Sequence, residues 1–258
     1  MASALITGGT SGIGLAFARE LAARGTDLIL VARDQDRLKG VAAELGEVHG
    51  VAVEVLPADL SDRDDTLRVA ARLEDPNRPV EWLINNAGFG LHSTVLDPDD
   101  IDLHAKALDV MCLAVLILGG AAGRAMRGRG HGHIINVASS SAAIYTGNYS
   151  AIKAWARTYS TALALELHGT GVTVTGLLPG WVKTEFHGRA GINASKLPGI
   201  VWIDPDKLVR QALTDAEKGK AESIPDLKWR AAMFIADHGP RGITRLVSRM
   251  LTASRKKH

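Results

Sequence analysis

The sequence has very little cysteine and very little net charge. Its single cysteine, Cys112, cannot form a disulfide within the chain, which fits a reducing compartment. Thirty basic and 28 acidic side chains leave a formal net charge of +2, so the composition gives no reason to expect a nucleic acid or another polyanion as partner. The basic tail at 255–258 is either simply solvated or in contact with an anionic surface.

Long apolar runs and metal-binding patterns are also lacking. The longest apolar run, 113–122, is far shorter than a bilayer span, and no apolar signal core follows a basic start. We therefore expect no transmembrane segment and a soluble, cytoplasmic protein. His131 and His133 lie two residues apart without a nearby acidic or sulfur partner, so we expect no metal site.

What the sequence does contain is an alternation of strand-like and helical patterns. We expect strands at 4–7, 28–31, 51–56, 82–84, 134–137, 172–178 and 223–224. We expect helices at 15–24, 38–45, 61–73 with Ser61 as its cap, 97–127, 149–168, 204–218, 229–236 and 243–251. No regular element is expected between 185 and 203. Such alternation is typical of a parallel sheet covered by helices on both faces.

A glycine-rich turn follows the first expected strand and precedes the first expected helix. Gly8, Gly12 and Gly14 let backbone N–H groups approach an anion, and the start of a helix adds positive potential. The turn therefore predicts a phosphate cradle. Its spacing, Gly-x-x-x-Gly-x-Gly, is not the commonest dinucleotide-binding pattern, and the alternative is that these glycines only allow tight packing of strand and helix.

The end of the second expected strand bears on cofactor choice. In a dinucleotide-binding fold, an acidic residue at this point binds the ribose 2′-hydroxyl, whereas an arginine accommodates a 2′-phosphate. The sequence has Ala32 followed by Arg33, with Asp34 beyond. Charge complementarity favours NADP(H) over NAD(H). The alternative is a surface arginine that pairs with a carboxylate.

Tyr149 and Lys153 lie four residues apart in a strongly helical pattern, and so share one helix face. A phenol titrates near pH 10 and is a poor base at neutral pH, but a neighbouring ammonium favours the phenolate. Tyr149 could therefore exchange a proton with a carbonyl that is reduced or an alcohol that is oxidised. A bare Tyr-x-x-x-Lys occurs by chance in many helices, so its meaning depends on the rest of the chain.

Four motifs, in this order, resemble the short-chain dehydrogenase/reductase family over roughly 4–224. They are Thr7-Gly8-x-x-x-Gly12-x-Gly14, then Asn85-Asn86-Ala87-Gly88, then Tyr149-x-x-x-Lys153, and then Pro179-Gly180 with Thr184. The resemblance implies an α/β fold: one three-layer, doubly wound Rossmann domain across 1–258, with a parallel sheet of about seven strands. It also implies a nicotinamide cofactor and a homodimer or homotetramer.

The same resemblance implies roles for individual residues. Tyr149 is expected to give or take the proton, Lys153 to lower its pKa and hold the nicotinamide ribose, and Ser139 to hydrogen-bond the substrate oxygen. Asp59 is expected to contact the adenine. The full set expected to bind the cofactor is Gly8, Thr10, Ser11, Gly12, Ile13, Gly14, Arg33, Asp59, Leu60, Asn86, Ala87, Gly88, Tyr149, Lys153, Pro179, Gly180, Val182 and Thr184.

Two features depart from the family pattern. Met111 stands where members usually carry an asparagine that holds a proton-relay water, and a thioether cannot donate a hydrogen bond. Either water replaces this relay or the enzyme is slow. From Ser139 to Tyr149 there are ten residues, about three fewer than is usual, so Ser140 or Ser141 is an alternative to Ser139.

The expected substrate side is a lid at 185–203, followed by a C-terminal helical extension at 225–258. Its apolar residues either bind a hydrophobic substrate or pack only the lid itself. These are Trp181, Phe186, Ile192, Leu197, Ile200, Val201 and Trp202, with His92 nearby. A steroid, an acyl chain or a bulky ketone would suit such a surface, and the C-terminal part resembles reductases near the long-chain 3-oxoacyl branch.

Two functions are therefore compatible with the sequence. The first is an NADP(H)-dependent oxidoreductase acting on a hydrophobic ketone, steroid or 3-oxoacyl substrate, which the Tyr149–Lys153 pair favours. The second is an NADP(H)-binding sensor or scaffold with weak catalysis, which Met111 favours. Nothing in the sequence points to epimerisation or dehydration.

Overall fold

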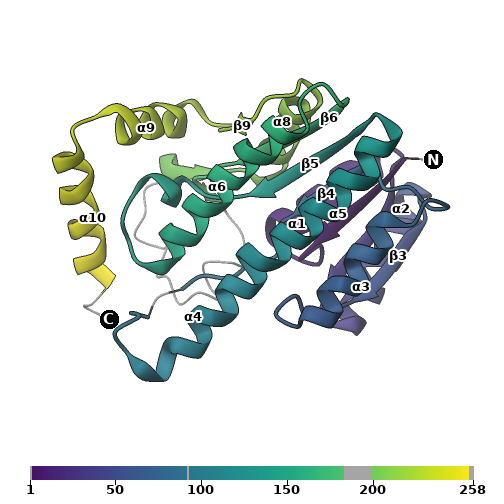
Figure 1. Cartoon of the computed structure of the whole chain (residues 1–258), viewed down its shortest axis with the longest axis horizontal. Coiled ribbons are helices and arrows are strands. Elements are labelled where there is room, and N and C mark those ends of the chain that lie inside the picture. The colour runs from purple at the N-terminus through teal and green to yellow at the C-terminus, as the bar shows by residue number, and fades with distance from the viewer. Residues whose placement is uncertain (1, 92, 183–198, 256–258) are drawn as a thin grey trace.

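Seven apolar strands pair in parallel to form the central sheet. The computed structural model describes residues 2–91, 93–182 and 199–255. In chain order the strands are β1 Ser3–Thr7, β2 Asp27–Ala32, β3 Val53–Pro57, β4 Trp82–Asn85, β5 Gly132–Val137, β6 Val172–Leu177 and β9 Glu222–Ser223. Their order across the sheet is β3-β2-β1-β4-β5-β6-β9 (Figure 1). The predicted short last strand is confirmed, since β9 pairs with β6 at the edge of the sheet.

Helices cover both faces of the sheet because successive strand residues point to opposite sides. In β1, Ala4 and Ile6 contribute to one core with helices α1 Gly12–Ala23, α2 Gln35–His49 and α8 Pro205–Glu217. Leu5 between them contributes to the other core. That second core contains α3 Arg63–Glu74, α5 Ala114–Arg129 and α6 Asn148–Glu166. The predicted three-layer, doubly wound fold is thus confirmed.

Several helices begin earlier than the sequence predicts. Asp34 caps α2 by accepting a hydrogen bond from the Arg37 backbone N–H. Ser61 is not the cap of α3, which was a wrong prediction: Asp62 accepts from the Asp65 N–H, and Ser61 hydrogen-bonds to Asp59. The first turn of α2 is polar and exposed, so apolar periodicity does not reveal it, whereas α3 begins one residue later than predicted.

The long helical stretch at 98–129 is continuous but not uniform. It contains a 3₁₀ turn at Pro98–Asp100, α4 Ile101–Leu108, one π-helical turn at Asp109–Leu113, and then α5. The π turn, which the sequence did not predict, carries Met111 and Cys112. Pro98–Arg129 is long and apolar enough to span a membrane by length and composition, and half of its most apolar window is buried inside the protein.

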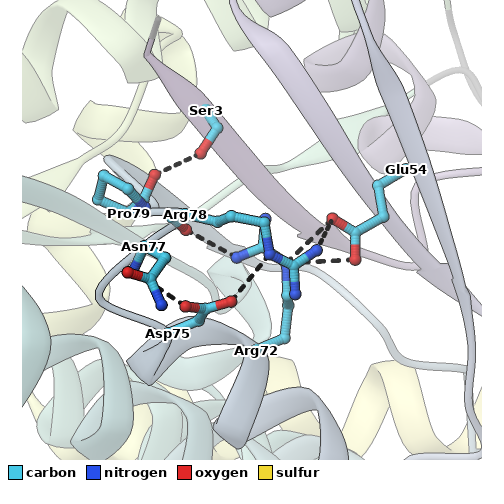
Figure 2. A network of polar contacts seen from close by, with 7 residues as sticks. All are labelled: Ser3, Glu54, Arg72, Asp75, Asn77, Arg78 and Pro79. Atoms are coloured by element: carbon cyan, nitrogen blue, oxygen red, sulfur yellow. Dashed lines mark hydrogen bonds and ion pairs between the residues drawn. The ribbon is translucent and has the colours of Figure 1, made fainter.

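A network of ion pairs and hydrogen bonds connects segments at the edge of the sheet where its strands begin (Figure 2). Arg72 of α3 donates from Nε to both carboxylate oxygens of Glu54 in β3, at 3.2 and 3.0 Å. Arg78 donates to Asp75 at 2.8 Å, and this hydrogen bond holds the pKa of Asp75 below its usual value. Ser3 at the start of β1 donates to the Pro79 carbonyl at 2.7 Å. The network therefore joins the turn before β4 to β1 and β3.

The C-terminal part adds a two-stranded sheet and two helices. Strand β7 Trp181–Val182 pairs in parallel with β8 Trp202–Ile203, so regular structure occurs where none was predicted. A 3₁₀ turn at Gly199–Val201 precedes β8, and α9 Leu227–His238 and α10 Arg241–Arg255 follow. Five residues of the predicted cofactor or substrate surface lie outside the described residues: His92, Thr184, Phe186, Ile192 and Leu197. The division into lid and extension stays a prediction.

Candidate active site

The predicted site motifs meet at one edge of the sheet because they follow the carboxyl ends of parallel strands. The glycine-rich turn follows β1, Asn86 follows β4, Ser139 follows β5, and Pro179 follows β6. Strand order reverses between β1 and β4, which is the topological switch point where doubly wound folds bind their ligands.

The glycines of the first turn are required by its backbone. Gly8 has φ 65° and Gly12 has φ 56°, values in the left-handed region that glycine favours. A side chain at Gly14 would overlap the Gly8 carbonyl oxygen and Asn86 Nδ2. Tight packing and an anion cradle are therefore not exclusive: Gly14 is needed for packing, and Gly8 and Gly12 shape the turn.

The start of α1 has the properties of an anion site. Ser11, its N-cap, makes no side-chain hydrogen bond to the helix, and the first turn has no acidic residue. By contrast, four other helices are capped by aspartates that accept a backbone N–H bond, namely Asp34, Asp62, Asp204 and Asp226. The first N–H groups of α1 and its positive end thus fit the diphosphate of a dinucleotide.

Thr7 and Asn86 bind the two cofactor motifs to each other. The Thr7 hydroxyl oxygen accepts from the backbone N–H groups of Asn86 and Ala87, at 2.9 and 3.0 Å. In return, Asn86 Nδ2 donates to the carbonyl oxygens of Thr7 and Gly8, at 2.9 and 3.3 Å. The loop after β4 is therefore fixed against the glycine turn, although Thr7 was not among the predicted site residues.

Two arginines lie close to the carboxyl end of β2. Arg33 is exposed directly after β2, as predicted. Arg37, one helical turn further on, donates from Nε to the carbonyl oxygen of Thr10 at 3.0 Å, so it holds the glycine-rich turn from α2. The sequence did not predict a role for Arg37, because the first turn of α2, in which it lies, was not recognised as helical.

Asp59 and Leu60 follow β3, at the same edge of the sheet. Burial alone would raise the pKa of Asp59, but hydrogen bonds from Ser61 and the charge of Lys106 outweigh it, so the pKa is lowered. Lys106 of α4 lies 3.4 Å from the Asp59 carboxylate. The acid is therefore ionised and held in place, while Leu60 is buried in the core.

Tyr149 and Lys153 are brought together as predicted. Both project from the first turns of α6, and Lys153 Nζ lies 5.7 Å from the centre of the Tyr149 ring. Lys153 is buried and donates to the Val137 carbonyl oxygen at 2.8 Å. Burial lowers the pKa of Lys153 to about 8. The ammonium therefore still predominates at neutral pH.

Cys112 is a neighbour of this lysine that the sequence did not reveal. It lies in the π turn of the long helix and interacts electrostatically with Lys153. Burial raises the pKa of Cys112 to about 11, and Lys153 opposes that rise. The thiol is therefore neutral at physiological pH, and it is not a nucleophile there.

The three candidate serines occupy one short turn after β5. Ser139 precedes the 3₁₀ turn Ser140–Ala143 and caps it, with its Oγ accepting from the Ser141 N–H at 3.1 Å. The Ser140 N–H donates to the Pro179 carbonyl at 2.9 Å, joining this turn to the end of β6. Ser139 as the substrate-binding serine stays a prediction; it lies two residues after the end of β5.

A chain of buried amides connects β4, β5 and α6. Asn85 Nδ2 donates to Asn136 Oδ1 at 2.9 Å, and Asn136 Nδ2 donates to Ser160 Oγ at 3.0 Å. Ser160 Oγ in turn donates to the Ala156 carbonyl at 2.7 Å. Because Ser160 belongs to the helix that carries Tyr149 and Lys153, this chain fixes that helix relative to the sheet.

Three tryptophans lie near the segment that follows β6, and we call them the apolar wall: Trp181 of β7, Trp202 of β8 and Trp229 of α9. A side chain at Gly180 would overlap the ring of Trp229, which donates to the Val201 carbonyl at 3.3 Å. Trp181 and Trp202 meet edge to face, with ring centres 6.0 Å apart. Val182 is buried in the core on the α1 and α8 side of the sheet. Trp229 was expected only as part of a helix, so its contact with Gly180 is new.

His131 is exposed, whereas His133 makes contacts within the fold. His133 Nδ1 lies 2.8 Å from the Thr173 hydroxyl, and its ring lies 4.2 Å from that of Trp82. Among the residues that the structure describes, no three His, Cys, Asp or Glu side chains are grouped as metal ligands would be.

Comparisons with known proteins agree with this geometry. The profile of the short chain dehydrogenase family matches residues 2–193. A short-chain dehydrogenase from Sphingobium yanoikuyae in complex with NADPH superposes with a TM-score of 0.83 and 35% identity, covering 94% of each chain. The bulky-bulky ketone specific alcohol dehydrogenase from Comamonas testosteroni gives a TM-score of 0.80 at 30% identity, covering 94% of this chain and 93% of that one.

A curated relative adds a third comparison. The very-long-chain 3-oxoacyl-CoA reductase of Anas platyrhynchos is 34% identical over 223 residues, which is 81% of this chain and 67% of that protein.

Proposed function

The chain belongs to the short-chain dehydrogenase family of oxidoreductases, and from that premise we propose that it is an NADP(H)-dependent reductase or dehydrogenase of a hydrophobic carbonyl or alcohol. The observation that carries the proposal is the Tyr149–Lys153 pair, which lies at the same sheet edge as the uncapped start of α1. A nucleotide bound at α1 and a substrate at Tyr149 would therefore occupy one continuous edge.

Bound NADPH would supply the hydride for the carbonyl carbon. Tyr149 would give its hydroxyl proton to the carbonyl oxygen and regain a proton from solvent, so charge and atoms balance. The buried Lys153 ammonium stabilises the phenolate that remains. A Ser139 hydroxyl would hold the substrate oxygen by a hydrogen bond, which orients the carbonyl for both transfers.

Preference for NADP(H) rests on the two arginines of the adenosine end. Arg33 provides an exposed positive charge where a 2′-phosphate would lie, and Arg37 holds the turn beside it. NADPH in the Sphingobium structure is consistent with this choice. The test is the ratio of dissociation constants for NADH and NADPH in wild type and Arg33→Asp. We expect the ratio to fall in the variant, and an unchanged ratio would refute the NADP(H) preference.

A hydrophobic substrate is supported by the apolar wall of Trp181, Trp202 and Trp229. The names of two relatives, one specific for bulky-bulky ketones and one for very-long-chain 3-oxoacyl-CoA, point the same way. We further propose a cytoplasmic homodimer or homotetramer. A panel of bulky ketones, oxosteroids and 3-oxoacyl thioesters, assayed by NADPH consumption, would identify the class.

The catalytic proposal is tested by replacing one hydroxyl. Tyr149→Phe should abolish NADPH-dependent reduction and leave the dissociation constant for NADPH nearly unchanged. Tyr145→Phe is the matched control, because Tyr145 is an exposed tyrosine four residues earlier. Full activity in Tyr149→Phe, on any substrate that the wild type reduces, would contradict the proposal.

One observation favours the second function, an NADP(H)-binding sensor or scaffold. Met111 is buried, 2% exposed, and a side chain at Gly88 would lie 2.9 Å from its sulfur atom. A thioether at this place cannot relay a proton through hydrogen bonds. Tight NADPH binding without turnover on the whole substrate panel, followed by recovery in Met111→Asn, would establish this second function. Turnover by the wild type would exclude it.

A further inference from the structure

The first turn of α6 carries Tyr149 but receives no cap from the side chain of its N-cap residue. That residue is Gly147, which has no side chain to accept a backbone N–H group. Ser150 reaches back instead: its Oγ accepts from the Thr146 N–H at 3.3 Å and lies 2.7 Å from the Thr146 hydroxyl. These bonds are local, so the place of this turn within the site is set by contacts with other segments.

His104 of α4 makes such a contact, to the residue directly before Tyr149. The imidazole is buried, with His104 only 3% exposed. Its Nδ1 lies 3.3 Å from Asn148 Nδ2, and its Nε2 lies 3.2 Å from the hydroxyl oxygen of Ser93 in the loop after β4. Both ring nitrogens therefore have a polar partner, and the two partners come from different segments.

The two partners determine which ring nitrogen carries the hydrogen. An amide nitrogen can only donate, so His104 Nδ1 accepts from Asn148 Nδ2. In a neutral imidazole the other nitrogen then carries the hydrogen, so Nε2 donates to Ser93 Oγ. The two bonds can therefore be separated by substitution, because asparagine places its amide oxygen near Nδ1 and glutamine places its amide nitrogen near Nε2.

The helix that holds His104 is itself anchored. α4 continues through the π turn into α5, and both Ala107 and Met111 are buried in the core on that side of the sheet. Lys106 of α4 also lies 3.4 Å from the Asp59 carboxylate, which follows β3. The imidazole therefore connects the start of α6 to an element that is packed into the core.

We propose that His104 is a positioning residue for Tyr149: through Asn148 it sets the first turn of α6, and through Ser93 it holds the loop after β4 beside that turn. The inference rests on the proposed function, because it concerns the alignment of Tyr149 with a substrate oxygen. Small displacements of a proton donor reduce the rate of the reacting complex, so the loss of this anchor should lower kcat more than it raises KM.

The test compares two substitutions that each keep one of the two bonds. On any ketone, oxosteroid or 3-oxoacyl thioester that the wild type reduces, we expect His104→Gln to lower kcat about tenfold, with KM within about twofold of the wild type. His104→Asn keeps the acceptor for Asn148 and should retain kcat within about twofold. Asn148→Ala should lower kcat as His104→Gln does, and the two substitutions together should lower it no further.

A second readout needs no turnover. Hydrogen exchange of the backbone N–H groups at 148–155 is measured in the full chain. We expect exchange about fivefold faster in His104→Gln than in the wild type, for the loss of one hydrogen bond, and wild-type exchange in His104→Asn. If the wild type reduces nothing on the panel, the proposed function fails, and the exchange rates still decide whether His104 positions α6.

The matched control is His133→Gln. His133 also contacts a hydroxyl, that of Thr173, but lies near the start of β5, away from the site. This variant should be less stable to heat, with unchanged kcat and unchanged exchange at 148–155. Equal values of kcat in His104→Gln and His104→Asn, or wild-type exchange at 148–155 in His104→Gln, would overturn the proposal and leave His104 as a packing residue.

Discussion

The ammonium of Lys153 donates to the carbonyl oxygen of Val137, 2.8 Å away, so strand β5 holds this lysine without help from any ligand. The bond crosses from the helix that carries Tyr149 to the strand that leads to Ser139. A lysine fixed in this way enters the site with its position set, which reduces the ordering that a substrate must bring about.

The burial of Lys153 predicts how stability depends on pH. Its pKa falls from 10.5 to about 8 on folding, so between these values the unfolded chain binds a proton that the folded protein has released. Stability therefore rises with pH across this window, by about 2 kcal/mol between about pH 7 and about pH 9.5. Urea unfolding of wild type and Lys153→Met at the two pH values should show this gain in the wild type only.

The matched control for this lysine is Lys39→Met, at an exposed position of α2. The difference in unfolding free energy between this variant and the wild type should be the same at both pH values. If the difference between wild type and Lys153→Met is also constant, the lysine is not desolvated as the structure indicates.

Gly14 should be intolerant of any side chain. In Gly14→Ala, the new methyl group would overlap the Gly8 carbonyl oxygen and Asn86 Nδ2, and we expect a loss of about 3 kcal/mol of unfolding free energy. Gly40→Ala is the control, because Gly40 lies inside α2 with open space around it, and it should gain about 1 kcal/mol. Thermal and urea unfolding measure both. Equal effects of the two substitutions would disprove the close contact.

The buried amide chain should link stability to activity. Asn136→Ala leaves Asn85 Nδ2 without its acceptor and removes the donor to Ser160 Oγ, which costs about 3 kcal/mol of stability. Ser160→Ala alone should cost less, and the two substitutions together should cost less than their sum. Strict additivity in the double-mutant cycle would show that Asn136 and Ser160 do not interact.

Arg37 and Arg33 should affect cofactor binding in different ways. Arg37→Gln removes the hydrogen bond to Thr10, and because the side chain is exposed we expect only about a fivefold weakening, equal for NADPH and NADH. Arg33→Gln should weaken NADPH binding alone. Fluorescence titration with both nucleotides distinguishes the two roles. A selective loss of NADPH binding in Arg37→Gln would show instead that this arginine contacts the 2′-phosphate.

The sequence predicted the sheet and the edge where the site lies. Buried strands such as β1 and β2 are recognisable in the sequence as short apolar runs. The motifs that follow such strands lie at one edge of a parallel sheet. Tyr149 and Lys153 were predictable as a pair because helical spacing alone brings them together. These features depend on local sequence.

The features that the sequence did not predict depend on contacts between distant segments. The bond between Asn85 and Asn136 follows from the register of β4 with β5, which no local pattern determines. The π turn that brings Cys112 near Lys153, and the contact of Trp229 with Gly180, likewise arise only after the helices have packed. The N-cap of α3 was predicted one residue too early, at Ser61 instead of Asp62, because both residue types suit an N-cap.

The ion-pair network of Glu54, Arg72 and Arg78 lies at the opposite edge of the sheet from Tyr149. Ion pairs therefore stabilise one edge of the sheet, while the expected cofactor and substrate loops follow the strands at the other edge. We expect that the segments after β6 can be replaced by those of a relative with another substrate without disturbing these ion pairs.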